Sequence, residues 1–146
     1  MNLLNLEPLE PLEPLRVLLP ASLAAVPLAL TLVGAQRGNT DPRYQWAALL
    51  AFGHYLLRQY DASLSWLREA LTLNPVHLQA LALRAAALAQ HGQSEEAAAA
   101  TKALLDNYPT ITVEKHLRNF YWKELADVAH YREGLLKAGV PSTKLV

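Results

Sequence analysis

A 34-residue internal repeat is the feature that most constrains how this chain of 146 residues can fold. Residues 44–77 and 78–111 form two blocks of equal length, and each has a proline at its thirty-second position, Pro75 and Pro109. Both blocks carry helical patterns, and a proline cannot continue the helix that precedes it. A repeat of this length predicts a pair of helices in each block, stacked on the next pair to share one core.

The two blocks also agree at the positions where paired helices must approach closely. The eighth position holds Ala51 and Ala85, and the twentieth holds Ser63 and Ala97, so all four side chains are small. Polar turns separate the two helices of the blocks at residues 58–61 and 92–95. The two blocks therefore match in their helix-contact and turn positions as well as in their length.

A period of this length is that of the tetratricopeptide repeat (TPR), a helix–turn–helix unit. We predict an all-α, TPR-like solenoid of helical hairpins over residues 39–146, with two full repeats. Two positions depart from the pattern. Arg84 stands where a large apolar residue is usual, and Thr101 replaces an aromatic residue.

Beyond Pro109 the repeat pattern changes. Residues 112–118 and 123–137 are predicted to be helical, and the second of these ends at Gly139 with Pro141 behind it. We interpret them as a degenerate third hairpin that caps the array, because a solenoid exposes its last apolar face unless something covers it. The aromatic residues 120–122 between the two helices are predicted to belong to the core.

The first sixteen residues have a pattern of their own. Leu-Glu-Pro occurs three times in succession over residues 6–14. A proline at every third position forbids a regular helix or strand and favours an extended polyproline-II arm, which also has three residues per turn. We predict an extended arm over residues 1–16, either as a poorly ordered terminus or as a docking peptide for a partner.

Residues 17–38 form an apolar segment, with no charge between Arg16 and Arg37. The nineteen residues 17–35 have the length of a membrane span, although two prolines interrupt them. Two interpretations remain open: a helix that covers the first repeat, or a membrane anchor. For an anchor, the positive charges that follow the segment would leave the repeats on the cytoplasmic side. We therefore expect a cytoplasmic location, with or without membrane association.

Most of the chain, residues 39–141, resembles the C-terminal repeat region of alphaproteobacterial class III adenylate/guanylate cyclases and of related TPR regulators. The motifs that carry the resemblance are DPRY at 41–44, YDASLSW at 60–66, ALTLNP at 70–75, LALRAAALA at 81–89, TV at 112–113 and YREGLLKAGVP at 131–141. In that family the repeats follow a catalytic domain and are regulatory. The forty residues before the repeats hold no such domain, so the resemblance implies the module and not the activity.

The composition excludes several classes of chemistry. Basic and acidic residues balance at 13 each, which gives no electrostatic argument for nucleic-acid binding. No cysteine is present, and none of the five histidines stands three or four residues from another, so no metal site is indicated. The six glycines are scattered singly and form no phosphate-binding loop. We expect a non-catalytic protein without a cofactor, with its histidines at the surface or half-buried.

The resemblance to TPR arrays implies that the first helix of each repeat lines a concave groove. The facing positions would be Gln45, Leu49, Phe52, Tyr55, Leu56, Gln79, Leu83 and Gln90, together with Ala48, Ala82, Ala86 and Ala89. The basic residues with which some TPR domains hold a terminal carboxylate are absent. The groove is therefore expected to be apolar, with Phe52 and Tyr55 as anchors for a peptide.

Three occupants of this groove remain open: a protein partner, the chain's own N-terminal segment, or a second copy of the chain. The leading hypothesis for function is a scaffold that binds a protein partner through the groove. The alternatives are a membrane-anchored TPR subunit of a membrane complex, and the regulatory tail of a cyclase-type signalling enzyme that lacks its catalytic domain.

Overall fold

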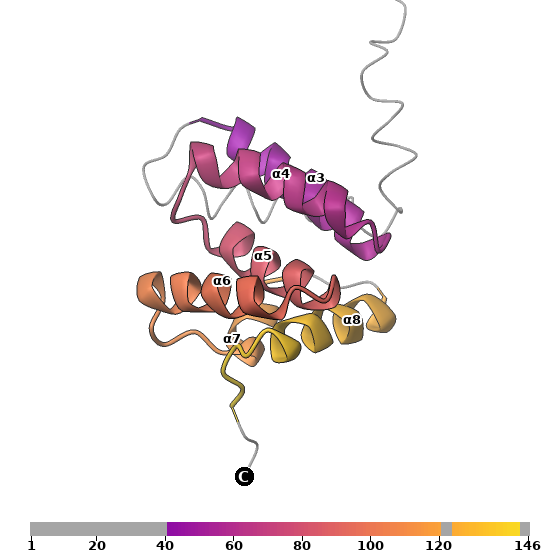
Figure 1. Ribbon diagram of the computed structural model, residues 1–146, viewed down its shortest axis with the longest axis vertical. Helices are drawn as coiled ribbons and strands as arrows, with labels where there is room; N and C mark the ends of the chain where they lie inside the picture. Colours follow the sequence, from indigo (N-terminus) through magenta and orange to yellow (C-terminus); the bar gives the residue numbers. More distant parts are fainter. Residues whose placement is uncertain (1–40, 121–123, 144–146) are drawn as a thin grey trace, which may run out of the picture.

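The computed structural model describes residues 41–120 and 124–143, and within these ranges the chain is helical and has no strand. This confirms the predicted all-α class. The helices are α3 (Arg43–Leu56), α4 (Tyr60–Leu73), α5 (Leu78–Gln90), α6 (Ser94–Asn107), α7 (Val113–Leu117) and α8 (Leu125–Lys137) (Figure 1). The predicted arm, the apolar segment 17–38 and two of the three residues 120–122 lie outside the described residues.

Helices α3 and α4 form one hairpin, and α5 and α6 form a second with the same backbone. The second helix begins at Tyr60 in one hairpin and at Ser94 in the other, one repeat length apart. The residues before these helices also agree, since Gln59 has φ −91° and ψ 70° and Gln93 has φ −88° and ψ 72°. The internal repeat in the sequence is therefore a repeat of backbone conformation.

Each hairpin turns through a residue with left-handed backbone. Arg58 has φ 60° in the first turn, and Gly92 has φ 84° at the matching position of the second. The next residue then donates its amide to a carbonyl of the preceding helix, Gln59 to His54 and Gln93 to Leu88, both at 2.9 Å. This motif satisfies carbonyl groups that the end of a helix leaves without partners.

The small residues seen in the sequence lie where the paired helices touch. Ala51 and Ala85 are fully buried, as are Ser63 and Ala97 to within 1%. The Ser63 hydroxyl donates a hydrogen bond of 2.8 Å to the Ala51 carbonyl, which gives this buried polar group a partner. Larger side chains at these positions would force the two helices of a hairpin apart.

The third pair of helices is arranged differently from the first two. Helix α7 is short, and α8 packs along α5 and reaches α3. The end of α8 is held by the Thr101 hydroxyl of α6, which donates 2.8 Å to the Ala138 carbonyl. Gly139, with φ 89°, turns the chain after α8, and the Pro141 carbonyl accepts from the Val113 amide at 2.9 Å.

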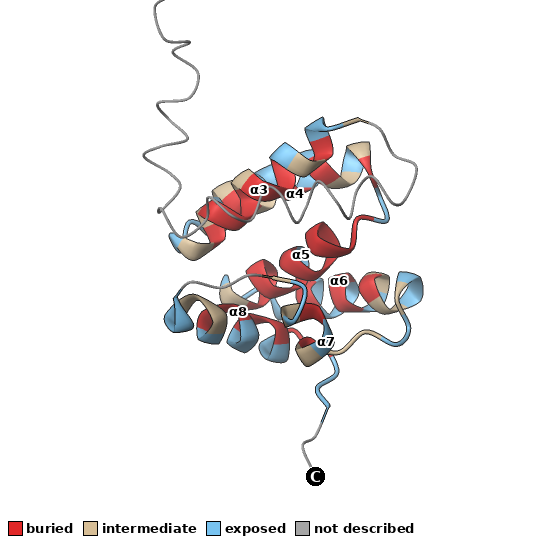
Figure 2. Cartoon of the chain, turned by 180° about the vertical axis from the view of Figure 1, so that it is seen from behind, coloured by how far each residue is buried: buried red, intermediate tan, exposed pale blue. Residues whose placement is uncertain are grey.

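Helix α5 is the centre of the core. Eleven of its thirteen residues are buried, and it packs against α4, α6 and α8 (Figures 1 and 2). Its many alanines allow three neighbours to approach it. Within the described part of the chain, no helix has both the length and the hydropathy to cross a bilayer.

Candidate functional site

The structure brings the predicted groove residues of α3 and α5 into the core instead of an open groove. Five of the eight are buried, and Gln45, Leu56 and Gln90 are half-buried. The buried five, with their exposed fractions, are Leu49 (2%), Phe52 (4%), Tyr55 (0%), Gln79 (8%) and Leu83 (2%). The alanines predicted to line the same groove, Ala48, Ala82, Ala86 and Ala89, are buried as well.

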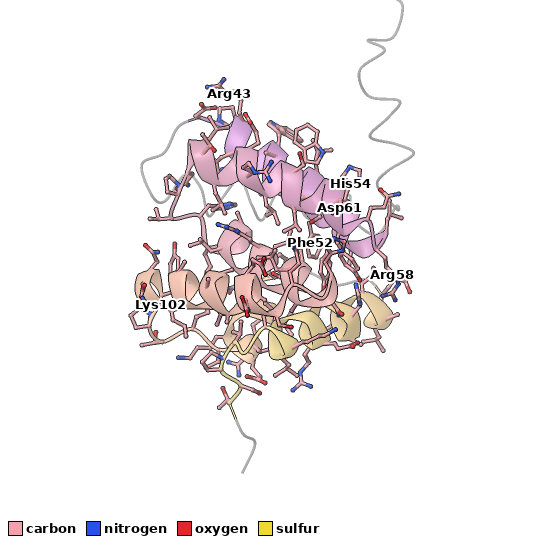
Figure 3. All side chains as sticks on the ribbon, in the orientation of Figure 1. Arg43, Phe52, His54, Arg58, Asp61 and Lys102 are labelled. Atoms are coloured by element: carbon pink, nitrogen blue, oxygen red, sulfur yellow. The ribbon has the colours of Figure 1, made fainter. Side chains whose placement is uncertain are left out.

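Aromatic contacts to the C-terminal part of the chain explain why the expected anchors are not exposed. The Phe52 ring stacks on Phe120 at 5.8 Å and meets the edge of Tyr131 at 5.3 Å. The Tyr55 ring stacks on His130 at 4.8 Å. In Figure 3, Phe52 lies between the first hairpin and the helices below it. The expectation that Phe52 and Tyr55 are exposed anchors is therefore wrong in this structure.

The close approach of α8 depends on a glycine. A Cβ atom on Gly134 would overlap the Tyr55 hydroxyl and would lie 3.1 Å from the Ala86 Cβ. The Tyr55 hydroxyl donates to the His130 carbonyl at 3.2 Å, and the Gln90 amide reaches the same carbonyl at 3.5 Å. Two of the predicted groove residues thus hold α8 in place.

His130 is joined to two side chains of the first hairpin. Its Nδ1 lies 3.0 Å from Arg58 Nη1, and its Nε2 lies 3.3 Å from the Tyr60 hydroxyl. A guanidinium only donates, so Nδ1 accepts and Nε2 carries the proton. Burial, and then the charge of Arg58, lower the pKa of His130. With both ring nitrogens engaged, the imidazole is a neutral link between the first hairpin and α8.

The other histidines divide between core and surface. His77 and His116 are buried like His130, with 3% and 1% exposed, while His54 is half-buried and His91 exposed. The expectation of surface or half-buried histidines is therefore wrong for three of the five, because aromatic neighbours cover their rings. Over residues 41–120 and 124–143, no three His, Asp or Glu side chains gather in a way that could hold a metal ion.

A cleft between α4 and α5, which reaches the start of α6, is the candidate binding site. Its volume is about 550 Å³. Its lining residues are Asp61, Leu64, Ser65, Arg68, Leu71 and Thr72 of α4, Arg84 and Leu88 of α5, and Gln93 before α6. We call this the α4–α5 cleft.

The α4–α5 cleft combines an apolar floor with two positive charges. Leu64 and Leu71 are half-buried against the core, and Leu88 is buried. Arg68 and Arg84 are exposed, and within the described residues neither guanidinium forms an ion pair. A surface that places guanidinium groups beside leucines can bind a carboxylate and an apolar side chain of one ligand.

One end of the cleft is acidic. The Asp61 carboxylate there is 89% exposed and lies 3.0 Å from His91 Nε2. Asp61 is labelled at the turn end of the first hairpin in Figure 3. A ligand with several carboxylates would therefore bind with these groups toward Arg68 and Arg84 and away from Asp61.

Sequence reasoning did not identify this cleft, although the sequence contained a signal. Arg84 departs from the repeat pattern, because a long charged side chain stands where an apolar one is usual. On α4, Leu64, Arg68 and Leu71 follow at spacings of four and three, which places them on one face of the helix. The proximity of Arg84 to this face depends on how the two hairpins stack.

No protein-family model, curated protein or solved structure matches this chain. The resemblance to TPR tails of cyclases therefore stays a prediction. The motif that carries it at residues 131–141 contains Tyr131, Gly134 and Gly139, each of which has a packing or backbone role in this structure.

Proposed function

We propose that this chain is a TPR-type scaffold that binds a protein partner through the α4–α5 cleft. The repeat class is supported by the two hairpins, whose turns recur at the TPR period, as do the start and the end of the second helix. Partner binding is supported by one observation above all. Arg68 and Arg84 stand beside the same leucine floor, and within the described residues neither of them forms an ion pair.

The ligand that suits this cleft is an extended peptide with leucine and acidic side chains. Each guanidinium can donate two parallel hydrogen bonds to a carboxylate, which makes the contact directional as well as attractive. The leucines contribute apolar contact area. The two charged contacts are exposed, so salt should weaken binding.

The proposed cleft replaces the concave groove of the sequence-based hypothesis, whose anchor residues are in the core. A protein partner, no nucleic acid and no cofactor remain parts of the proposal, as does a cytoplasmic location. The membrane-anchored subunit and the cyclase-type regulatory tail remain predictions from residues 17–35 and from the family resemblance.

A random peptide library, selected on the immobilised full-length chain, tests the proposal. We expect the selected peptides to be enriched in leucine with aspartate or glutamate. Their affinities, measured by fluorescence anisotropy, should fall by about tenfold or more in Arg68→Ala/Arg84→Ala, since a hydrogen bond to a charged group contributes about 1.5–3 kcal/mol.

Arg118→Ala is the matched control, because Arg118 is also exposed but lies beyond α7, outside the cleft. This variant should bind the selected peptides as the wild type does. Selected peptides that bind the double variant as tightly as the wild type would rule out the cleft. A selection that enriches no peptide would argue against the whole proposal.

A further inference from the structure

The α4–α5 cleft indicates how far apart the apolar side chains of its ligand should lie, as well as which side chains the ligand should carry. Leu64 and Leu71 stand two helical turns apart on α4, and a helix rises 1.5 Å per residue, so they lie about 10 Å apart along its axis. Arg68 stands between them, and Arg84 faces them from α5. A matching ligand would present apolar side chains at a similar interval, with carboxylates between them.

One segment of this chain has that pattern. Residues 6–15 carry leucines at every third position, a glutamate after each of the first three, and a proline after each glutamate. In the polyproline-II conformation that such a sequence favours, the rise is 3.1 Å per residue, so like side chains recur about every 9 Å. This interval agrees with the spacing of Leu64 and Leu71 to within about 1 Å.

The charges are also complementary. Glu7, Glu10 and Glu13 give residues 6–15 three negative charges and no positive one. The cleft offers two guanidinium groups against the single carboxylate of Asp61. In a polyproline-II segment, leucine, glutamate and proline occupy three separate edges, so the leucines can face α4 while the glutamates face the arginines.

The length of chain between the two sites permits the contact. Residues 16–40 separate the Leu-Glu-Pro segment from Asp41, where the described part of the chain begins. At about 3.3 Å per residue an extended chain of this length spans roughly 80 Å. That exceeds the diameter expected of a domain of this size. A tethered ligand of this kind is present at a millimolar effective concentration, so weak intrinsic binding suffices.

We propose that the Leu-Glu-Pro arm, residues 6–15, occupies the α4–α5 cleft of its own chain. The inference rests on the proposed function of that cleft and names the chemistry of its ligand. The arm would then be an internal competitor, and a partner with the same leucine and glutamate pattern would have to displace it.

A spin label beside the arm gives a direct test. The chain has no cysteine, so Asn5→Cys allows one label on the full-length protein next to the leucine repeat. The amide signals of the ¹⁵N-labelled chain are then compared with the label oxidised and reduced. We expect selective loss of intensity at residues 64–71 and 84–88, and none on the outer face of α8.

Two sets of variants give the control. Glu7→Gln, Glu10→Gln and Glu13→Gln together keep every leucine and proline of the arm and remove its charge, so the intensity loss should disappear. Arg68→Ala/Arg84→Ala should have the same effect, while Arg118→Ala should leave the loss unchanged. An intensity loss that survives both charge-removing sets would overturn the proposal.

A mixture of spin-labelled chain without ¹⁵N and ¹⁵N-labelled chain without a spin label distinguishes the same chain from a second copy. Intensity loss in this mixture would overturn docking within one chain. If the arm gives no effect on the cleft but library peptides still require Arg68 and Arg84, only this inference fails. If neither ligand depends on the arginines, the proposed function fails with it.

Discussion

The two helical hairpins share a backbone and differ in what they pack. At matching positions of the repeat, α3 places Phe52 and Tyr55 where α5 places Ala86 and Ala89. The large rings of the first hairpin extend to α8, whereas the alanines of the second let α8 lie close against α5. The repeat therefore specifies the hairpin geometry, and the departures from the repeat decide where the third layer packs.

The largest expected effect on stability tests this difference between the rings of α3 and the alanines of α5. Tyr55→Ala removes a fully buried ring and its hydrogen bond to α8, so unfolding free energy should fall by about 3–5 kcal/mol, as for other large aromatic truncations. Ala89→Gly, at the matching position of α5, should cost about 1 kcal/mol through helix propensity. Urea denaturation of both variants measures the two losses of unfolding free energy. Equal losses would contradict the proposed difference between the two hairpins.

Acid should destabilise the fold, because His116 is buried among aromatic rings. Burial lowers the pKa of His116 to about 4 from its ordinary 6.5. Between these pH values the unfolded chain takes up a proton that the folded chain does not, so stability is complete above pH 6.5 and falls toward pH 4. One proton over this interval corresponds to roughly 3 kcal/mol.

Denaturation curves from neutral pH down to the lowered pKa check this loss, with His116→Phe as the comparison. His130 has a lowered pKa as well and contributes in the same direction, so the variant should retain a smaller slope. If the unfolding free energy of His116→Phe fell with pH as steeply as that of the wild type, His116 would not be the cause of the loss.

The contact between α8 and the two hairpins should respond to a single methyl group. Gly134→Ala gains helix propensity but places its Cβ on the Tyr55 hydroxyl. We expect a net loss of about 1–2 kcal/mol, from overpacking less the propensity gain. In a Tyr55→Phe background the loss should be smaller, because the hydroxyl is absent. A double-mutant cycle with no coupling between the two positions would show that this contact does not limit the approach of α8.

The smallest expected effect concerns the turns. Arg58→Gly relieves a left-handed backbone that costs a non-glycine residue about 1 kcal/mol, although it also removes the contact with His130. Gly92→Ala imposes that strain on the second turn, where no atom obstructs a Cβ. Thermal denaturation at neutral pH should therefore show a small gain for Arg58→Gly and a small loss for Gly92→Ala. Shifts of the same sign would show that the turns are not equivalent.

Much of the hairpin architecture could be predicted because its causes are local. Prolines, left-handed turns and small residues at positions such as Ala51 and Ala97 act between residues close in the sequence. The candidate binding site, the α4–α5 cleft, could not be predicted in the same way. The resemblance to TPR arrays predicts a concave groove along the first helix of each repeat, whereas in the structure α8 packs on α5 and reaches α3.

The sequence by itself determined the helical class, the internal repeat and the places where helices begin and end. Only the tertiary structure decided which faces are covered, since the burial of Phe52 and Tyr55 depends on Phe120, His130 and Tyr131, which stand far from them along the chain. The same holds for the meeting of Arg68 and Arg84 over one leucine floor. Local geometry follows from neighbouring residues, whereas exposure depends on every element that packs against a surface.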